Sequence, residues 1–145
     1  MCALFWGMIG QPCACHVGTL AVVITQEFTM LYTGSCHCGQ TRYEIEGELG
    51  HVIECNCSYC RRKGPLMWFV PRDALKLHTP EDALATYRFN RHVIAHHFCP
   101  NCGCAPFGMG TDPSGNAMVA VNVRCLDDID FAALEVMQYD GLHRN

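Results

Sequence analysis

The chain has 145 residues, which is enough for one domain with a buried core but too few for two full cores. Half of the residues are apolar and 17% are charged, a composition typical of a globular protein and not of a disordered chain. A formal net charge of -4 and a pI near 6.0 provide no basic surface for a phosphate backbone, so we expect no nucleic-acid partner.

The first 26 residues contain no Lys, Arg, Asp or Glu, a composition that a membrane anchor or an export signal would also have. However, the first Lys or Arg of the chain is Arg42, and three glycines and a proline interrupt the segment between residues 7 and 18. An anchor or signal would have a positive region and a longer apolar run. We therefore predict that residues 1–30 are a poorly ordered extension, uncharged as far as residue 26, and that the protein does not enter a membrane.

From residue 31 onward, short segments rich in β-branched and aromatic residues are interrupted by Gly, Pro or Asn every roughly 8–12 residues, which predicts a mainly β domain. Tyr43 and Ile45 should share one face of the first strand. Short helical turns are expected at residues 58–63, where Ser58 could cap, and at 80–84 and 130–134. The expected strands are residues 41–46, 52–54, 66–70, 75–78, 85–89, 93–98, 106–109, 118–122 and 134–139.

Twelve cysteines in a chain of this length indicate either disulfides in an oxidising compartment or metal sites in a reducing one. Seven of them lie in three tight clusters, and neighbours one or two residues apart converge more easily on one ion than on separate disulfides. The spacing therefore favours metal sites, and we expect a cytoplasmic protein. The clustered residues are Cys36, Cys38, Cys55, Cys57, Cys60, Cys99 and Cys102.

The first and last clusters each supply two sulfurs, so neither completes a tetrahedral zinc site by itself. Together, Cys36, Cys38, Cys99 and Cys102 would close one site and join the beginning of the domain to its later part, which would contribute to folding. The alternative is that these cysteines are free buried thiols. Spacing alone leaves open which clusters share an ion.

The middle cluster, Cys55, Cys57 and Cys60, supplies three sulfurs within six residues and leaves an ion one ligand short. Zinc with an open position can hold an incoming thiol as a thiolate nucleophile at neutral pH. This cluster is therefore the candidate catalytic site, and a thiol suits it better than a phosphate. The alternative is that a fourth side chain, His97 or Cys104, closes the site.

Basic and imidazole side chains near the clusters suggest further roles. Arg61, Arg62 and Lys63 directly follow the middle cluster, where they could attract carboxylates of a substrate or simply form an exposed basic turn. His96 and His97 could move protons, but neighbours on a strand point to opposite faces, so at most one can face a given site. The sequence leaves the general acid and base unassigned.

Three motifs occur in order along the chain: Gly34-Ser-Cys-His-Cys-Gly39, Cys55-Asn-Cys-Ser-Tyr-Cys-Arg-Arg62 and His97-Phe-Cys-Pro-Asn-Cys-Gly103. Together they resemble the glutathione-dependent formaldehyde-activating enzyme family, which also includes centromere protein V. The resemblance extends from about residue 31 to residue 141 and includes the late Tyr139-Asp-Gly141. We therefore predict a zinc-binding domain at residues 31–141 and a tail at residues 142–145.

The resemblance implies a sheet-rich, zinc-clipped fold of the Mss type with two zinc ions. The implied activity is that of a carbon-sulfur lyase, which forms or splits S-hydroxymethylglutathione from glutathione and formaldehyde. By motif position, the structural zinc would be held by Cys36, Cys38, Cys99 and Cys102, and a second, labile zinc by Cys55, Cys57 and Cys60. Cys104 departs from the family pattern, and we interpret Cys104 and Cys125 as buried thiols.

The alternative function is a non-catalytic zinc module whose surface binds a protein partner. A fourth protein ligand at the middle cluster would favour the module, whereas an open position would favour the enzyme. The expected partners of the enzyme are a small thiol such as glutathione and an aldehyde. The sequence leaves the true substrate, the direction of reaction and the oligomeric state open.

Overall fold

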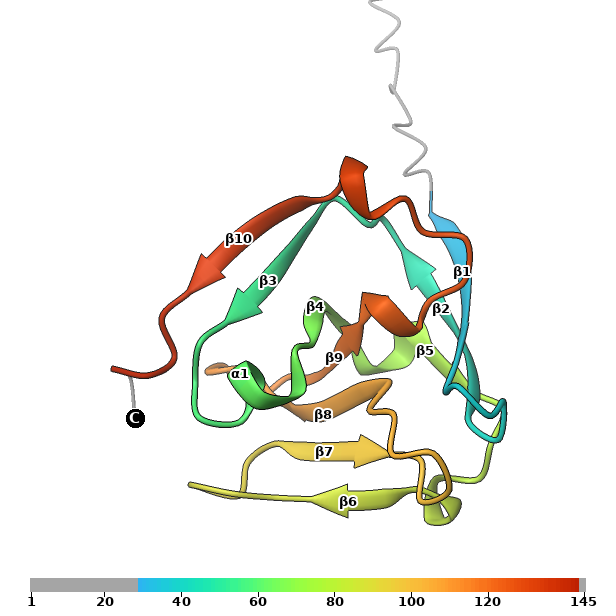
Figure 1. Ribbon diagram of the computed structural model, residues 1–145, viewed down its shortest axis with the longest axis horizontal. Helices are drawn as coiled ribbons and strands as arrows, with labels where there is room; N and C mark the ends of the chain where they lie inside the picture. Colours follow the sequence, from blue (N-terminus) through green and yellow to red (C-terminus); the bar gives the residue numbers. More distant parts are fainter. Residues whose placement is uncertain (1–28, 144–145) are drawn as a thin grey trace, which may run out of the picture.

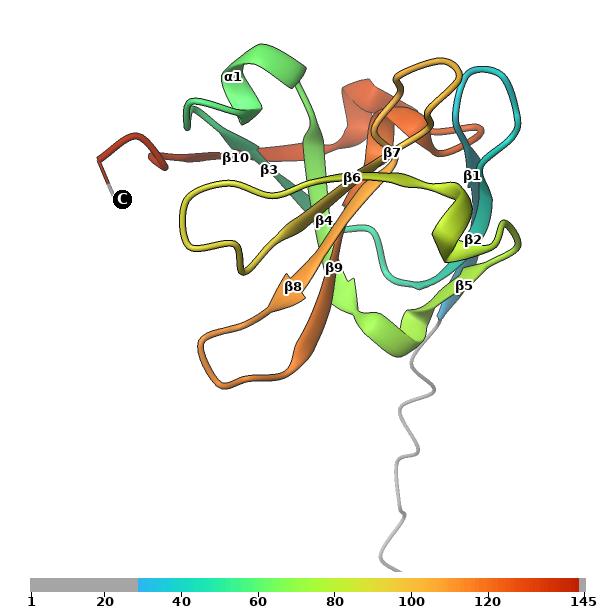
Figure 2. The same ribbon diagram turned by 90° about the horizontal axis from the view of Figure 1, so that it is seen from below.

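The computed structural model describes residues 29–143, which form two β-sheets packed around one core (Figures 1 and 2). The smaller sheet has three strands in the order β1-β2-β5, and the larger has seven in the order β10-β3-β4-β9-β8-β7-β6. Residues 1–28 of the predicted extension and residues 144–145 of the predicted tail lie outside the described residues. The mainly β fold with few short helices is confirmed.

The smaller sheet contains β1 (Met30–Ser35), β2 (Arg42–Gly47) and β5 (Leu75–Leu77), all antiparallel. β1 is not among the expected strands, and its Gly34 weakens the strand pattern. A Cβ on Gly34 would lie 2.5 Å from the Tyr43 ring, so close packing requires glycine there. Tertiary packing therefore explains the strand that the local sequence pattern did not indicate.

The larger sheet contains all its strands in antiparallel pairs except β10, which runs parallel to β3 at one edge. Each of the nine expected strands is present, with ends shifted by one or two residues. The strands are β3 (His51–Cys55), β4 (Leu66–Pro71), β6 (Ala85–Tyr87), β7 (Ala95–Phe98), β8 (Phe107–Thr111), β9 (Ala117–Asn122) and β10 (Glu135–Tyr139).

The helical segments are short, as expected. The prediction that Ser58 caps the first one is wrong, because Tyr59 already has helical backbone angles, occupies the N-cap position, and makes no side-chain capping bond. Gly64 ends this helix in the left-handed conformation, with φ of 66°. The segments are α1 (Cys60–Lys63), η1 (Arg72–Ala74), η2 (Glu81–Ala83), η3 (Val123–Cys125) and η4 (Phe131–Ala133).

The core lies between the two sheets. Tyr43 and Ile45 share the inner face of β2, as predicted, and both are fully buried. Tyr43 packs edge-on against Phe107 of the larger sheet, with 5.4 Å between the ring centroids. Across residues 29–143, no helix has the length and apolar character that a membrane crossing requires.

Candidate metal centres

The first and last cysteine clusters meet in space. Cys36 and Cys38 lie in the loop between β1 and β2, and Cys99 and Cys102 lie in the turn that follows β7. The four Sγ atoms lie within 4.8 Å of one another. The Sγ of Cys38 is 3.6 Å from the Sγ of Cys36 and 3.6 Å from that of Cys99. The structure thus brings together the two pairs whose association spacing alone left open, and it joins a loop of the smaller sheet to a turn of the larger one.

Each of these two loops turns back through a glycine with positive φ. The N–H of Gly39, whose φ is 74°, donates to the carbonyl of Cys36 at 2.9 Å. The N–H of Gly103, whose φ is 73°, donates in the same way to Cys99. L side chains rarely adopt this conformation, so glycine allows both loops to aim their paired sulfurs at one point.

The four-sulfur cluster fits a tetrahedral zinc ion. Zn–S bonds of about 2.3 Å place the sulfurs of a tetrahedron about 3.8 Å apart, close to the distances between these Sγ atoms. The backbone N–H of Cys104 lowers the pKa of the Cys102 thiol to about 6. Burial raises the pKa of Cys36, but hydrogen bonds led by that from Thr41 outweigh it and leave the pKa below its ordinary value. Both effects favour the thiolates that zinc binds.

The middle cluster is local in sequence. Cys55 is the last residue of β3, Cys57 lies in the loop that follows, and Cys60 is the first residue of α1. Their Sγ atoms lie within 4.8 Å of one another. The N–H of Cys57 donates to the Sγ of Cys55 and the N–H of Cys60 to the Sγ of Cys57, each at 3.4 Å. The backbone of the loop therefore aims the three sulfurs inward, toward a shared point.

Electrostatics within this trio favours a bound cation. Burial raises the pKa of Cys57, but the backbone N–H groups of Cys60 and Tyr59 outweigh it and hold the pKa below its ordinary value. Burial and then repulsion from Cys55 raise the pKa of Cys60, and burial raises that of Cys55. Three neighbouring thiolates are unfavourable without a positive charge between them, and a divalent ion supplies it.

Neither side chain expected as an alternative fourth ligand reaches the trio. His97 is buried on the opposite side of β7, where its Nδ1 lies 3.0 Å from the hydroxyl of Thr86 and its ring packs on Phe107. Cys104 belongs to neither sulfur cluster. Among residues 29–143, no His, Cys, Asp or Glu adds a fourth ligand atom within the span of this group. Among the described side chains, the trio therefore has no fourth ligand and is open.

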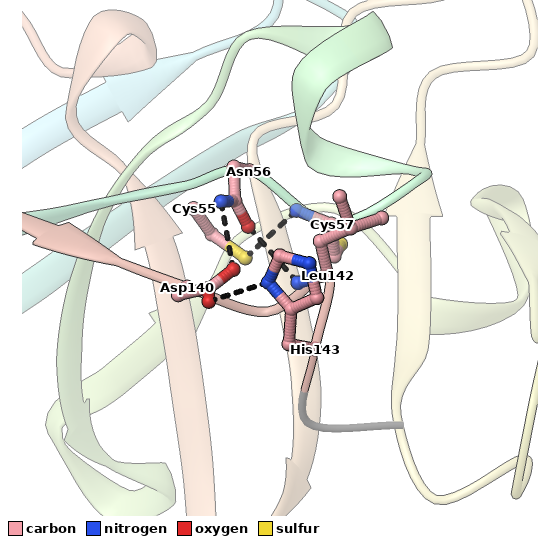
Figure 3. Close-up of polar contacts among 6 residues, drawn as sticks. All are labelled: Cys55, Asn56, Cys57, Asp140, Leu142 and His143. Carbon is pink, nitrogen blue, oxygen red and sulfur yellow. Dashed lines mark hydrogen bonds and ion pairs between the residues drawn. The ribbon is translucent and has the colours of Figure 1, made fainter.

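The segment after β10 lies beside Cys55 and Cys57 of the trio (Figure 3). The side chain of Asn56 donates to Asp140 at 2.9 Å and accepts from the N–H of Leu142 at 2.9 Å. Asp140 in turn contacts His143 at 2.7 Å. Gly141, between the two residues that bond to Asn56, is buried directly against Cys55 and Cys57. Residues more than 80 positions apart in sequence thus form one wall of the site.

We predict that Asn56→Ala weakens metal binding at the trio by about 10–100-fold, the usual effect of losing a side chain that positions metal ligands. The substitution removes both side-chain hydrogen bonds from residue 56 to the C-terminal segment but leaves its backbone bond to Tyr139 and all seven clustered cysteines in place. Competition with a chromophoric chelator measures the affinity. Gln138→Ala is the matched control, since it removes a different side-chain bond between β10 and β3, the one to Glu54. Equal affinities of the two variants would contradict the prediction.

A cavity of about 960 Å³ opens beside the trio, lined by all three of its cysteines and by Gly141. Of the basic run, Lys63 lines the cavity, whereas Arg61 and Arg62 do not, and Arg62 instead donates to the carbonyl of Ser58. Of the three, only Lys63 is therefore placed to meet a substrate in the cavity, and the two arginines form an exposed basic turn.

Two further predictions concern residues at this cavity. Of the described histidines, His96 lines the cavity, and burial lowers its pKa. His96 and His97 thus point to opposite faces, as predicted.

Cys104 and Cys125 are half-buried and line the cavity, so our interpretation of them as buried thiols is wrong. The reason is that the cavity interrupts the packing on their side of the larger sheet. Burial nevertheless raises the pKa of Cys125 to about 11.

Sequence reasoning missed the roles of Asn56 and Gly141 near the trio. Their signal was weak: Asn56 stands between two of the cysteines, and Gly141 belongs to the late motif that contributed to the family resemblance. Neither residue carries chemistry that identifies a site by itself. Their importance comes from the parallel pairing of β10 with β3, which places the C-terminal segment beside the loop.

Comparison with known proteins supports the resemblance. The model of the family described as glutathione-dependent formaldehyde-activating enzyme matches residues 31–139, which include both sulfur clusters. The chain is also similar to a Rhodobacter sphaeroides protein of known crystal structure, with 25% sequence identity and a TM-score of 0.62. That similarity covers 72% of this chain and 99% of the other.

Proposed function

The chain belongs to the glutathione-dependent formaldehyde-activating enzyme family, and from this premise we propose that it is a zinc-dependent carbon-sulfur lyase. It forms or splits the adduct of a glutathione-like thiol and an aldehyde, with S-hydroxymethylglutathione as the family's example. In the direction of formation, the thiol sulfur bonds to the carbonyl carbon and the thiol proton ends on the carbonyl oxygen. The expected setting is the cytoplasm, where reduced cysteines persist.

We assign a structural zinc ion to Cys36, Cys38, Cys99 and Cys102, and a second zinc ion to Cys55, Cys57 and Cys60. The second ion would supply a positive charge that lowers the pKa of a substrate thiol. The observation that carries the proposal is the trio of sulfurs with no fourth ligand among the described residues, opening onto a cavity. A closed four-ligand site would have favoured the non-catalytic module instead.

Two side chains that line the cavity suit such a substrate. Lys63 lies next to the trio, and its ammonium can pair with a carboxylate of a glutathione-like thiol. His96 faces the same cavity, and because burial lowers its pKa it is a neutral imidazole near pH 7 that can accept a proton. The segment at Gly141 shields the sulfurs from one side.

The test compares zinc-loaded wild-type protein with Cys57→Ala. We expect two zinc ions per wild-type chain and one per variant chain, because two sulfurs no longer hold the second ion. Two-dimensional exchange NMR of glutathione and formaldehyde should show accelerated adduct exchange with the wild type and the uncatalysed rate with the variant. Ser58→Ala, an exposed residue of the same loop, is the control and should match the wild type. Fully loaded wild-type protein that does not accelerate exchange would refute the proposed function.

A further inference from the structure

The cavity beside the trio is much larger than a one-carbon aldehyde requires. Its volume of about 960 Å³ lies near the upper end of the range of roughly 300–1,000 Å³ for pockets that enclose drug-sized ligands. Its lining includes Cys57, Met67, Phe69 and Ile94, and most of the lining is apolar. The hydroxymethyl group of a formaldehyde adduct would leave this apolar surface uncovered.

One side of the cavity is formed by stacked rings that begin inside the metal-binding loop. Tyr59 stands between Cys57 and Cys60, and its ring centroid lies 4.2 Å from that of His96 and 5.5 Å from that of Phe89. We call these three cavity-lining rings the aromatic wall. Tyr87 supports it from behind, 5.7 Å from Tyr59 and 5.9 Å from Phe89.

The contacts within the aromatic wall fix its position relative to the trio. Tyr59 lies in the loop before α1, Phe89 lies in the loop between β6 and β7, and His96 lies in β7. Stacking between these separate segments holds the rings in place without a ligand. A flat apolar group bound at the trio would therefore meet a preformed surface, which lowers the entropic cost of binding.

The charges around the cavity are all of one sign. Its charged lining residues are Lys63, Arg91 and Arg124, and the described lining contains no Asp or Glu. Lys63 is oriented by a bond to the carbonyl of Gly103 at 3.4 Å. Carboxylates of a bound thiol thus have partners at the basic residues, while the aromatic wall has no charge for them to pair with. The two kinds of surface favour an adduct with an anionic thiol part and an apolar carbonyl part.

We propose that the carbonyl substrate of this site is an aldehyde with an aromatic or similarly bulky apolar substituent, which packs against Tyr59, Phe89 and His96. The carboxylates of the thiol substrate lie at Lys63 and Arg91. This inference rests on the proposed function and specifies its substrate class. The chemistry is the same addition, in which a carbon-sulfur bond forms and the thiol proton passes to the carbonyl oxygen, so no oxidant or reductant is needed.

Two stable thioethers test this inference without any turnover. S-benzylglutathione represents an adduct with an aromatic substituent, and S-methylglutathione represents one with a single carbon. Calorimetric titration of the zinc-loaded wild type should show S-benzylglutathione binding more tightly by about tenfold, the effect of burying most of a phenyl ring. Equal affinities, or tighter binding of S-methylglutathione, would overturn the inference.

A substitution in the aromatic wall tests whether this wall causes the preference for the benzyl group. In Phe89→Ala the ratio of the two affinities should fall close to one. In Phe131→Ala, an exposed phenylalanine that does not line the cavity, the ratio should stay at the wild-type value. A ratio that Phe89→Ala leaves unchanged would overturn the assignment to the aromatic wall. The wild-type comparison remains decisive even if a variant fails to fold.

The outcomes separate this inference from the function on which it rests. Turnover of glutathione and formaldehyde together with equal thioether affinities would refute the aromatic substituent and leave the lyase intact. A benzyl preference without turnover of formaldehyde or benzaldehyde adducts would support the apolar subsite and refute the lyase. Faster adduct exchange with benzaldehyde than with formaldehyde, measured by the same NMR method, would support both.

Discussion

Cys99→Ala is expected to abolish the stable fold. Cys99 is fully buried, its Sγ lies 3.6 Å from that of Cys38, and its cluster joins the loop of the smaller sheet to the turn after β7 in the larger one. A structural zinc site contributes about 10–16 kcal/mol, as much as the whole stability of a typical domain, which is about 5–15 kcal/mol. Even a loss of about 4 kcal/mol would lower the melting temperature by about 10–20 °C.

Circular dichroism during heating, together with zinc content, measures this effect. Cys104→Ala is the matched control, because it makes the same change two residues beyond Cys102 at a thiol that belongs to neither cluster. We expect it to retain both zinc ions and a melting temperature near that of the wild type. A Cys99→Ala protein that melts within a few degrees of the wild type would show that the four-sulfur cluster does not stabilise the fold.

Gly141→Ala is expected to eliminate the second metal ion and the activity while leaving the fold intact. A Cβ at this position would lie 2.7 Å from the Sγ of Cys55, closer than real Cβ contacts allow, and 3.0 Å from the Cβ of Cys57, which is tighter than most of them. The backbone of Gly141 does not have positive φ, so the effect is steric and falls on the trio. Either the sulfur moves away from the other two, or the C-terminal segment leaves the site.

Zinc content and adduct exchange again provide the measurements. We expect one zinc ion per chain instead of two, exchange at the uncatalysed rate, and an unchanged melting temperature. Gly50→Ala is the matched control, since a Cβ there would have no neighbour within 4 Å and its φ is ordinary. Two bound ions and wild-type exchange in Gly141→Ala would contradict the close packing of this glycine against the trio.

The two substitutions together distinguish the roles proposed for the two clusters. If one cluster is structural and the other catalytic, Cys99→Ala should lose folding and Gly141→Ala should lose chemistry with folding retained. If instead Cys99→Ala loses only activity and Gly141→Ala loses folding, the four-sulfur cluster is the catalytic site and the trio is the structural one. This contrast does not depend on the identity of the aldehyde, so it tests the metal sites separately from the substrate class.

Local sequence determined much of the fold. Alternation of apolar residues placed nine strands correctly to within two residues, because burial of one strand face imposes a period of two on the sequence. The cysteine clusters were equally readable, since thiolates that share an ion must be close and short loops keep them so. The strand at Gly34 was missed because the reason for its glycine is the ring of Tyr43, which lies on another strand.

Only the tertiary structure decided what surrounds the trio. The parallel pairing of β10 with β3 brings Gly141 to Cys55, and the stacking of Tyr59 on Phe89 and His96 creates the aromatic wall. The sequence also did not show which residue of the basic run faces the cavity: Lys63 does, and the two preceding arginines do not. Sequence patterns specify which faces are buried and which atoms can bind a metal. Contacts between segments far apart in the chain depend on the packing of the whole fold, so they had to be seen in three dimensions.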